Sequence, residues 1–353
     1  MILAGDIGGT NTRLVLTDSD NNHVKFKEGT EKSYESKQYS GLLEVVDIFL
    51  KDMDCPSRKI EAIGIGVAGP VKKDRNPEGD IERSVKLTNI HWPTFSEHDL
   101  RAKFELDREH VSLINDMEAI AYAIPELTDE DTVELNPQAK DKEFGNRALI
   151  SAGTGLGELL LLQDEKQKDK YHFSPSEGGN TNFPPTNTLE MELLQYYQKR
   201  LENSYVRVED LVSGPGIARI YQFLKDHPSH PSESAEVEQA LKGTKSEHDY
   251  PPIISRYAVE NKDPLCDATL NLFASMYGNE VGNMMLKYLA FGGVYLGGGI
   301  APKILDYLKN GLFINAMRNR GIFSDSVFDV SVKVIMHKKV GLLGAARKAL
   351  GKE

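Results

Sequence analysis

Two short segments of the chain combine glycines with polar residues in a pattern that could bind phosphate. The first lies between the apolar residues 1–4 and 14–16 and places one carboxylate, Asp6, at a turn. Glycines let backbone N–H groups approach a ligand closely, and converging N–H groups form a site for anions. Because Asp6 would repel a bare phosphate, the pattern indicates a metal-bound nucleotide, although an ordinary glycine-rich hairpin would have the same residues. The segment contains Gly5, Asp6, Ile7, Gly8, Gly9, Thr10 and Asn11.

The second segment has the same design. The apolar residues 148–151 precede Gly153, Thr154 and Gly155, and the apolar residues 159–162 follow them. We expect a strand, a turn and a second strand in both segments, and therefore two related lobes that each offer a phosphate-binding turn to a shared cleft. A P-loop or a dinucleotide-binding fingerprint would need a helix directly after the glycines, and neither segment predicts one.

The dipeptide Asn115-Asp116 could carry out acid–base chemistry. It follows a short apolar run at 111–114, which predicts that it lies at the carboxyl end of a strand. Open α/β sheets place their ligand sites at this end. There Asp116 could accept a proton from a hydroxyl group while Asn115 fixes the orientation of that hydroxyl. The same dipeptide is typical of a helix N-cap, and the residues alone leave both interpretations open.

Other carboxylates and amides lie beside glycines further along the chain. Glu177 and Asn180 belong to a loop at 176–180, and Glu209 comes shortly before 213–216, whose glycines and proline predict a turn. Two carboxylates would repel a charged substrate, whereas the hydroxyls of a neutral sugar both donate and accept hydrogen bonds. These residues therefore indicate a site for a polyol.

Composition limits the class of protein. A chain of 353 residues exceeds the size at which single cores stop growing, so two domains are expected. The net charge of -11 argues against a nucleic-acid partner. Two cysteines exclude a disulfide framework and fit a reducing cytoplasm. With no signal peptide and no apolar run of membrane-spanning length, we expect a cytoplasmic protein that has no membrane partner.

Hydrophobic periodicity predicts an α/β architecture, in which strands alternate with crossover helices. The segments 71–84, 128–146 and 225–250 are polar and are expected to be loops or turns, and polar residues 17–23 are expected to turn into a further strand. The expected helices are 42–50, 117–124, 189–201, 266–290 and 342–350, and the expected strands outside the two glycine hairpins are 60–67, 111–114, 294–296 and 330–336.

Taken in order, these motifs resemble those of the bacterial-type glucokinases, which are members of the sugar-kinase, hsp70 and actin superfamily. The resemblance covers nearly the whole chain and includes the later segments 292–295 and 297–299. It implies a two-lobed, ribonuclease-H-like (actin-like ATPase) α/β fold with a deep cleft between the domains. The smaller domain would comprise residues 1–126 and 338–353, and the larger domain residues 127–337.

The resemblance also implies substrates and roles. ATP and Mg²⁺ are the expected cofactors, D-glucose is the expected substrate, and Asp116 is the expected catalytic base, with Asp6 holding the metal ion. A homodimer is expected, because members of the family are often dimers. The implied ATP-binding residues are Gly5, Asp6, Ile7, Gly8, Gly9, Thr10, Asn11, Gly153, Thr154, Gly155, Gly297, Gly298 and Gly299. The implied sugar-binding residues are Thr88, Asn89, Asn115, Asp116, Glu177, Asn180 and Glu209.

The chain departs from the family pattern at one sugar-binding position. The family loop usually reads Glu-Gly-Gly-His, whereas this chain has Asn180 at the histidine position. A kinase for another hexose, such as mannose, fructose or N-acetylmannosamine, therefore stays open. A non-catalytic nucleotide- or sugar-dependent regulator would need an N-terminal DNA-binding segment, for which the first strand leaves no room. An actin-like polymerising ATPase would have no need of Asn115-Asp116 together with Glu177 and Glu209.

Overall fold

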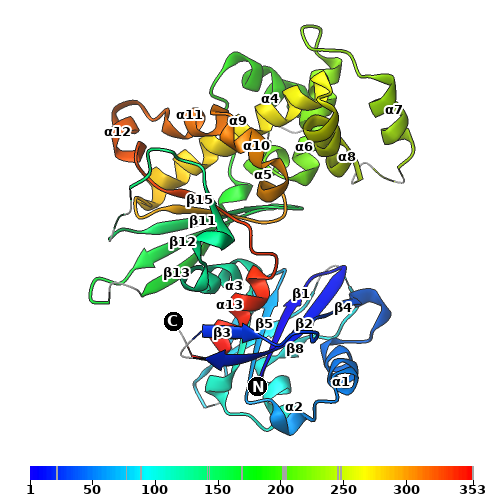
Figure 1. The fold of residues 1–353 in the computed structure, drawn as a ribbon, viewed down its shortest axis with the longest axis vertical. Coiled ribbons are helices and arrows are strands. Elements are labelled where there is room, and N and C mark those ends of the chain that lie inside the picture. Colours follow the sequence, from blue (N-terminus) through cyan, green and yellow to red (C-terminus); the bar gives the residue numbers. More distant parts are fainter. Residues whose placement is uncertain are drawn as a thin grey trace. The chain divides into compact units, whose positions relative to one another are not determined.

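The computed structural model describes residues 1–20, 23–76, 78–87, 90–140, 142, 144–167, 170–200, 205–244, 246 and 249–351. The chain divides into two compact units, residues 1–130 with 337–353 and residues 131–336. Each unit is built on its own mixed sheet with helices packed against it (Figure 1). Within the described ranges, no helix is both long and apolar enough to cross a membrane.

The sheet of the first unit explains why the first glycine turn and Asn115 lie at one edge. Strand β1 (Ile2–Ile7) is antiparallel to β2 (Asn11–Asp20) and parallel to β5 (Ala62–Val67), which is itself parallel to β9 (Val111–Asn115). Asp6 is paired with Gly66, and Val67 with Asn115, so the carboxyl ends of the three parallel strands share one edge. The strand order is β3 (His23–Phe26), β2 (Asn11–Asp20), β1 (Ile2–Ile7), β5 (Ala62–Val67) and β9 (Val111–Asn115), with β4 (Lys32–Glu35) also paired to β2.

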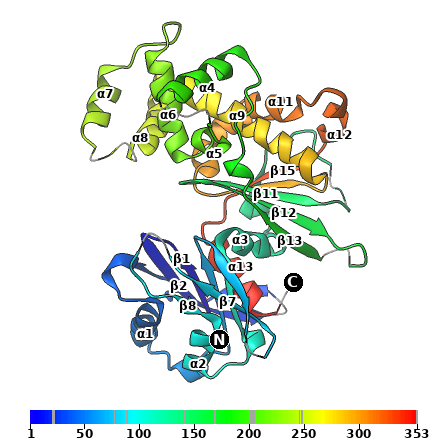
Figure 2. The ribbon, with the colours of Figure 1, turned by 180° about the vertical axis from the view of Figure 1, so that it is seen from behind.

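Helices cover both faces of this sheet because β1 is apolar on both sides. Leu3 and Ile7 pack with α1 (Leu42–Asp52) and α2 (Glu97–Phe104), whereas Ile2 and Ala4 pack with α13 (Val340–Ala349). Helix α3 (Asp116–Ala123) lies beside α13 (Figures 1 and 2). Helix α13 can approach β5 closely because Gly64 has no side chain: a Cβ there would lie 1.9 Å from the carbonyl oxygen of Ala345.

The sheet of the second unit repeats the topology of the first. An antiparallel meander is formed by β11 (Arg147–Ala152), β12 (Leu156–Gln163) and β13 (Tyr171–Ser176). On the other side of β11, the strands β14 (Val294–Gly297) and β15 (Val332–Ile335) follow in parallel. This arrangement corresponds strand by strand to β1, β2, β3, β5 and β9. The prediction of two related α/β lobes is confirmed. The strand order is β10 (Thr132–Glu134), β15 (Val332–Ile335), β14 (Val294–Gly297), β11 (Arg147–Ala152), β12 (Leu156–Gln163) and β13 (Tyr171–Ser176).

Helix α9 (Pro264–Tyr288) forms the centre of the helical layer of this unit. Leu270, Phe273, Tyr277 and Met284 on it are fully buried, so its methionines and tyrosines belong to the core, as their spacing predicts. The other helices of the unit are α4 (Thr188–Arg200), α5 (Val208–Leu211), α6 (Gly214–Asp226), α7 (Ala235–Lys242), α8 (Tyr250–Arg256), α10 (Leu305–Lys309), α11 (Leu312–Arg318) and α12 (Ser324–Val327).

Several segments expected to be loops are regular elements. Residues 71–84 contain most of the hairpin β6 (Val71–Arg75) and β7 (Ile81–Val85), which pairs with β8 (Phe95–Ser96); most of its side chains are solvent-accessible, so no apolar alternation marks it. Strand β2 extends to Asp20, β10 falls in 128–146, and α7 falls in 225–250. The expected turn at 213–216 is the beginning of α6, whose N-cap Ser213 accepts a hydrogen bond from the backbone N–H of Gly216.

Candidate active site

Asp6 lies on the face of β1 that is turned toward α13. The first turn of that helix is close, because a Cβ at Gly341 would lie 3.6 Å from Asp6 Oδ2. The amino end of a helix carries partial positive charge, which favours a carboxylate beside it. The guanidinium of Arg13, directly opposite Asp6 on β2, forms an ion pair with Asp6 and donates through Nη1 to the carbonyl oxygen of Lys338 at 3.3 Å. Arg13 thus fixes the Asp6 carboxylate, a role that the motif did not predict.

The first glycine turn connects two antiparallel strands, as predicted. The Gly8 N–H donates to the Asn11 carbonyl at 2.9 Å and closes the turn. Its outer side is supported by Ser36, whose hydroxyl donates to the Gly8 carbonyl at 3.0 Å and whose N–H donates to the Thr10 carbonyl at 2.9 Å. Gly8 and Gly9 are partly exposed and Thr10 is exposed, so a ligand can reach the turn.

Both interpretations of Asn115-Asp116 are compatible with the structure, because the two residues have different positions. Asn115 is the N-cap of α3: its Oδ1 accepts from the Met117 N–H at 2.9 Å, and its own N–H donates to Glu118 at 3.1 Å. Its Nδ2 donates to the Gly69 carbonyl at 3.0 Å, which holds the amide in place. Asp116 is the first residue of the helix, at the carboxyl edge of the sheet.

The Asp116 carboxyl has the electrostatic character of a proton acceptor. Burial raises its pKa from 3.8 to about 6, and the nearby charge of Asp6 also raises it, while the hydrogen bond from the Met117 N–H acts in the opposite direction. A pKa close to neutrality lets a carboxylate take up a proton and release it again during turnover. Thr88 and Asn89, the other sugar-binding residues expected in this unit, lie outside the described residues.

In the second unit, the predicted turn at Gly153, Thr154 and Gly155 lies beside the predicted segment 297–299. Ser151 is paired with Gly297, so both segments leave the same edge of the sheet. Gly298 has a backbone φ of +81°, and a Cβ there would lie 2.3 Å from the Ala152 carbonyl. The N–H of Gly214, the first residue of α6, donates to the Gly153 carbonyl at 2.8 Å. The amino end of α6, which carries partial positive charge, therefore adjoins the turn at 153–155. The sequence did not predict this, because residues 213–216 were expected to be a turn.

The structure brings Glu177, Asn180 and Glu209 together through Arg207. The amide Nδ2 of Asn180 donates to Glu177 Oε2 at 2.9 Å, and Arg207 Nη1 donates to Asn180 Oδ1 at 2.8 Å. The same Nη1 donates to Glu209 Oε1 at 3.0 Å. The second oxygen of Glu209 accepts from the N–H of Leu156, at the end of the glycine turn, at 2.9 Å. The predicted sugar-binding residues and the predicted phosphate turn of this unit are thus hydrogen-bonded to one another.

Arg207 is a candidate site residue that the sequence did not reveal. Its guanidinium is held by Asp210, which accepts from Nε at 3.1 Å and from Nη2 at 2.8 Å. Arg219 also donates to Asp210 Oδ1 at 2.9 Å. Burial acts to raise the pKa of Asp210, but the hydrogen bonds and charges of the two arginines outweigh it and hold this pKa below its ordinary value. The only signal for Arg207 in the sequence is its position two residues before Glu209, because its contact with Asn180 spans 27 residues.

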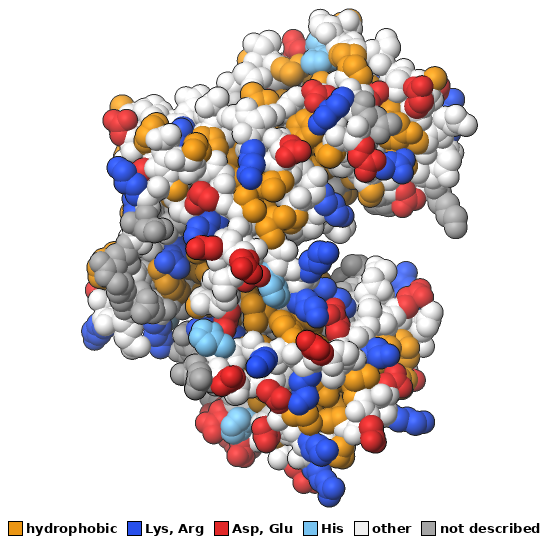
Figure 3. All heavy atoms as spheres, in the orientation of Figure 1, with side chains coloured by type: hydrophobic (Ala, Val, Ile, Leu, Met, Phe, Trp, Pro, Cys, Tyr) orange, Lys and Arg blue, Asp and Glu red, His pale blue; other side chains and the backbone are white. Residues whose placement is uncertain are grey.

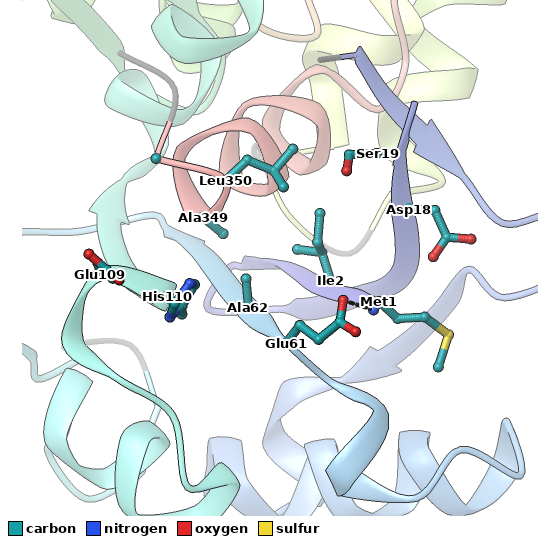
Figure 4. Close-up of a pocket in the computed structure, with 11 residues that line it drawn as sticks. Met1, Ile2, Asp18, Ser19, Glu61, Ala62, Glu109, His110, Ala349 and Leu350 are labelled. Atoms are coloured by element: carbon teal, nitrogen blue, oxygen red, sulfur yellow. Dashed lines mark hydrogen bonds and ion pairs between the residues drawn. The ribbon is translucent and has the colours of Figure 1, made fainter. Parts of the chain in front are cut away.

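One cavity among the described residues lies away from the candidate site residues. Figure 4 shows this cavity of about 560 Å³, lined in part by Ile2, Ala62 and Leu350. Ile2 and Ala62 begin β1 and β5, whereas the candidate site residues follow the carboxyl ends of these strands. On the face of the protein drawn in Figure 3, acidic and basic side chains of the described residues are interspersed.

The described residues contain no group of three or more His, Cys, Asp or Glu side chains that could hold a metal ion. Mg²⁺ does not require such a group, because it is usually bound by one or two carboxylates, several waters and the phosphates of a nucleotide. Asp6, a partly exposed carboxylate beside the first glycine turn, fits this mode of binding.

Two sheets of matching topology, each followed at its carboxyl edge by a glycine turn, are the architecture of the two-lobed, ribonuclease-H-like class of proteins. The first unit also contains the carboxylate Asp116, and the second unit contains the polar cluster around Asn180. A sequence profile of the family described as Glucokinase matches residues 3–352. The chain therefore belongs to the glucokinase family.

Individual relatives agree with this assignment. The chain is 37% identical over 353 residues to a glucokinase of Nostoc sp., and the match covers 98% of each chain. Among solved structures, it is similar to the crystal structure of a glucokinase from an Antarctic psychrotroph, with a TM-score of 0.78, 28% identity and 99% of each chain covered. A glucokinase of the ROK family from Streptomyces griseus, described in complex with glucose and AMPPNP, shares the fold, with a TM-score of 0.58, 19% identity and 98% and 97% of the two chains covered.

Proposed function

We propose that this protein is a glucokinase, which transfers the γ-phosphoryl group of ATP to the 6-hydroxyl of D-glucose and releases glucose 6-phosphate and ADP. The observation that carries the proposal is the match to the glucokinase family over residues 3–352. The site geometry supports it, because it supplies a proton acceptor, two glycine turns and a polar cluster suited to a neutral sugar.

The two glycine turns would bind the nucleotide. The N–H groups of the first turn, residues 5–11, and those of Gly153, Thr154 and Gly155 would contact the phosphates, and the segment 297–299 would contact the adenosine. Bound Mg²⁺ would neutralise charge on the transferring phosphoryl group. Asp6 would hold this ion, and the ion pair with Arg13 supports the role because it fixes the position of the carboxylate.

Asp116 would act as the general base. Phosphoryl transfer depends mainly on positioning and on charge stabilisation, so the protein needs only one group to take the proton of the attacking hydroxyl. The raised pKa of Asp116 supports this role, and the hydrogen-bonded amide of Asn115 would orient the hydroxyl. Glu177, Asn180 and Glu209, with Thr88 and Asn89, would bind the other hydroxyls of the sugar.

We further propose that the two units correspond to the two domains expected from the sequence, residues 1–126 with 338–353 and residues 127–337. A homodimer is the proposed oligomeric state, on the basis of the family resemblance alone.

The proposed activity is tested by measuring ADP release from Mg-ATP with a panel of hexoses, including glucose, mannose, fructose and N-acetylmannosamine. Glucose is expected to give the highest kcat/KM. A higher value with another hexose would identify a kinase for that sugar and would point to Asn180 as the origin of the difference. No ADP release with any sugar would contradict a kinase and favour a regulator that binds the same ligands.

A further inference from the structure

The guanidinium of Arg207 makes four hydrogen bonds to side chains, and they are arranged asymmetrically. Asp210, whose side chain is nearly buried, accepts from Nε and Nη2 and so clamps two sides of the guanidinium. Only Nη1 points to the residues proposed to bind the sugar, and its two N–H groups match its two acceptors, Asn180 Oδ1 at 2.8 Å and Glu209 Oε1 at 3.0 Å. A planar fork held in this way offers its donors in fixed directions.

The clamp decides which way the Asn180 amide faces. Oδ1 accepts from Arg207, and Nδ2 donates to Glu177 Oε2 at 2.9 Å. A flipped amide would direct its N–H groups at the guanidinium and its oxygen at a carboxylate, so both contacts would become repulsive. Asn180 therefore keeps one remaining N–H available to a ligand, and this N–H has a fixed direction.

The same arginine fixes the Glu209 carboxylate. Oε1 accepts from Arg207 Nη1, and Oε2 accepts from the Leu156 N–H at 2.9 Å. The hydroxyl groups of a sugar are distinguished by the directions in which donors and acceptors face them. A residue that fixes an amide and a carboxylate together therefore influences which epimer fits best.

We propose that Arg207 is a positioning residue that sets the hexose selectivity of the site by fixing the orientations of Asn180 and Glu209. This inference rests on the proposed function, because it assigns Arg207 to the same sugar site. Arg207 would not touch the reacting atoms, so its loss should affect the binding of sugar far more than the chemical step.

The test compares Arg207→Gln and Arg207→Lys with the matched control Arg219→Gln. Both arginines donate to Asp210, but only Arg207 also contacts Asn180 and Glu209. Glucose and its 2-epimer mannose are assayed with saturating Mg-ATP, and a thermal melt of each variant reports folding. Because lysine has one ammonium group in place of the fork, Arg207→Lys keeps the charge while losing the geometry.

We expect Arg207→Gln to raise KM for glucose about tenfold, the loss typical of a hydrogen bond to a charged group. Its kcat should stay within about threefold of wild type, the signature of a contact that acts on binding. The preference for glucose over mannose should narrow in Arg207→Gln and in Arg207→Lys, and should be unchanged in Arg219→Gln. In an Asn180→Ala background, Arg207→Gln should have a smaller effect, because part of its action passes through Asn180.

Three results would overturn the inference: an unchanged preference in both Arg207 variants, an equal change in Arg219→Gln, or full additivity with Asn180→Ala. Each requires that the wild-type protein phosphorylates a hexose. A wild-type protein that is inactive with every hexose would instead contradict the proposed function, so the two failures are distinguishable. If Arg207→Gln does not fold, the preference of Arg207→Lys for glucose over mannose tests the inference.

Discussion

Replacing Asp116 with asparagine should make the protein more stable at alkaline pH while it removes most of the activity. The carboxyl of Asp116 has its pKa raised from 3.8 to about 6, first by burial and then by the charge of Asp6. Such a shift means that ionised Asp116 costs folding free energy. Asparagine has nearly the same shape and carries no charge, so Asp116→Asn should remove that cost.

The magnitude follows from the linkage between proton binding and folding. Below pH 3.8 the carboxyl is protonated in the folded and the unfolded chain, so it affects stability little. Between 3.8 and about 6 the folded protein binds more protons, and the free energy of unfolding therefore falls as the pH rises. The whole difference between a pKa of 3.8 and one of about 6 corresponds to about 3 kcal/mol in the free energy of unfolding. We expect Asp116→Asn to gain about 2 kcal/mol of stability, because the side chain keeps some contact with solvent.

The assay is chemical or thermal unfolding of wild type and Asp116→Asn at pH 8 and at pH 3.5. Asp116→Asn should be more stable at pH 8, and the advantage should nearly vanish at pH 3.5. In parallel, kcat should fall by at least about a hundredfold, because general-base catalysis contributes about a hundred- to ten-thousandfold. The acid limb of the wild-type profile of kcat/KM for glucose should have an apparent pKa near 6.

The matched control is Asp99→Asn, which alters a carboxylate of the same unit that caps α2 by accepting from the Ser96 N–H at 2.8 Å. Asp99→Asn should leave kcat unchanged and should not stabilise the protein at pH 8. An Asp116→Asn variant that gains equal stability at both pH values would show that the ionisation of Asp116 is not the cause. Retention of more than about a tenth of the wild-type kcat would remove Asp116 from the role of base.

Three further predictions concern other described residues. Glu158 is buried, and its pKa is raised from 4.5 to about 7 by burial and by the charge of Glu280, against the opposing effect of Lys287. Because the ionised carboxylate therefore destabilises the folded protein, Glu158→Gln should raise the melting temperature at pH 9 and leave it nearly unchanged at pH 4. An equal gain at both pH values would contradict this linkage. Trp92 is buried and donates to the carbonyl of Ser36, and Ser36 supports the first glycine turn. Mg-ATP alone should therefore change the fluorescence emission of this single tryptophan. An unchanged spectrum at saturating nucleotide would argue against nucleotide binding at the turn. Asn180→Ala should raise KM for glucose by about two- to tenfold, the worth of one hydrogen bond, and unaltered KM and sugar preference would place Asn180 outside the sugar site.

The parts of the fold that the sequence predicted are those in which burial alternates or repeats. The two glycine hairpins were predictable because apolar runs flank each of them, and both are antiparallel strand pairs in the structure. The hairpin of β6 and β7 was not, because most of its side chains contact solvent and leave no periodic signal. The first turn of α6 was taken for a turn because Gly214 and Pro215 are typical of both, and proline is well suited to the beginning of a helix.

The candidate site shows the same division between local and long-range information. Asn115 and Asp116 could be predicted because they are adjacent in the sequence and follow a buried strand, so the end of that strand fixes both. The pairing of Asp6 with Arg13 requires the register of two strands, and the motif gives no sign of it. The contact between Arg207 and Asn180 requires tertiary packing, because Asn180 lies in the loop after β13 and Arg207 lies at the start of α5, and these two segments contact each other.

This division has a physical reason. A group that acts on the reacting atoms needs an exact position, and the end of a strand or the first turn of a helix provides one through the backbone alone. Selectivity between epimers depends on the directions in which hydrogen-bond donors and acceptors face the sugar. These directions are set by hydrogen bonds between side chains. Arg207 illustrates the second case, because one buried carboxylate, Asp210, orients it and it in turn orients Asn180 and Glu209. From the proposed sugar site it follows that two chains with identical sugar-contacting residues differ in hexose preference when they differ at this one position.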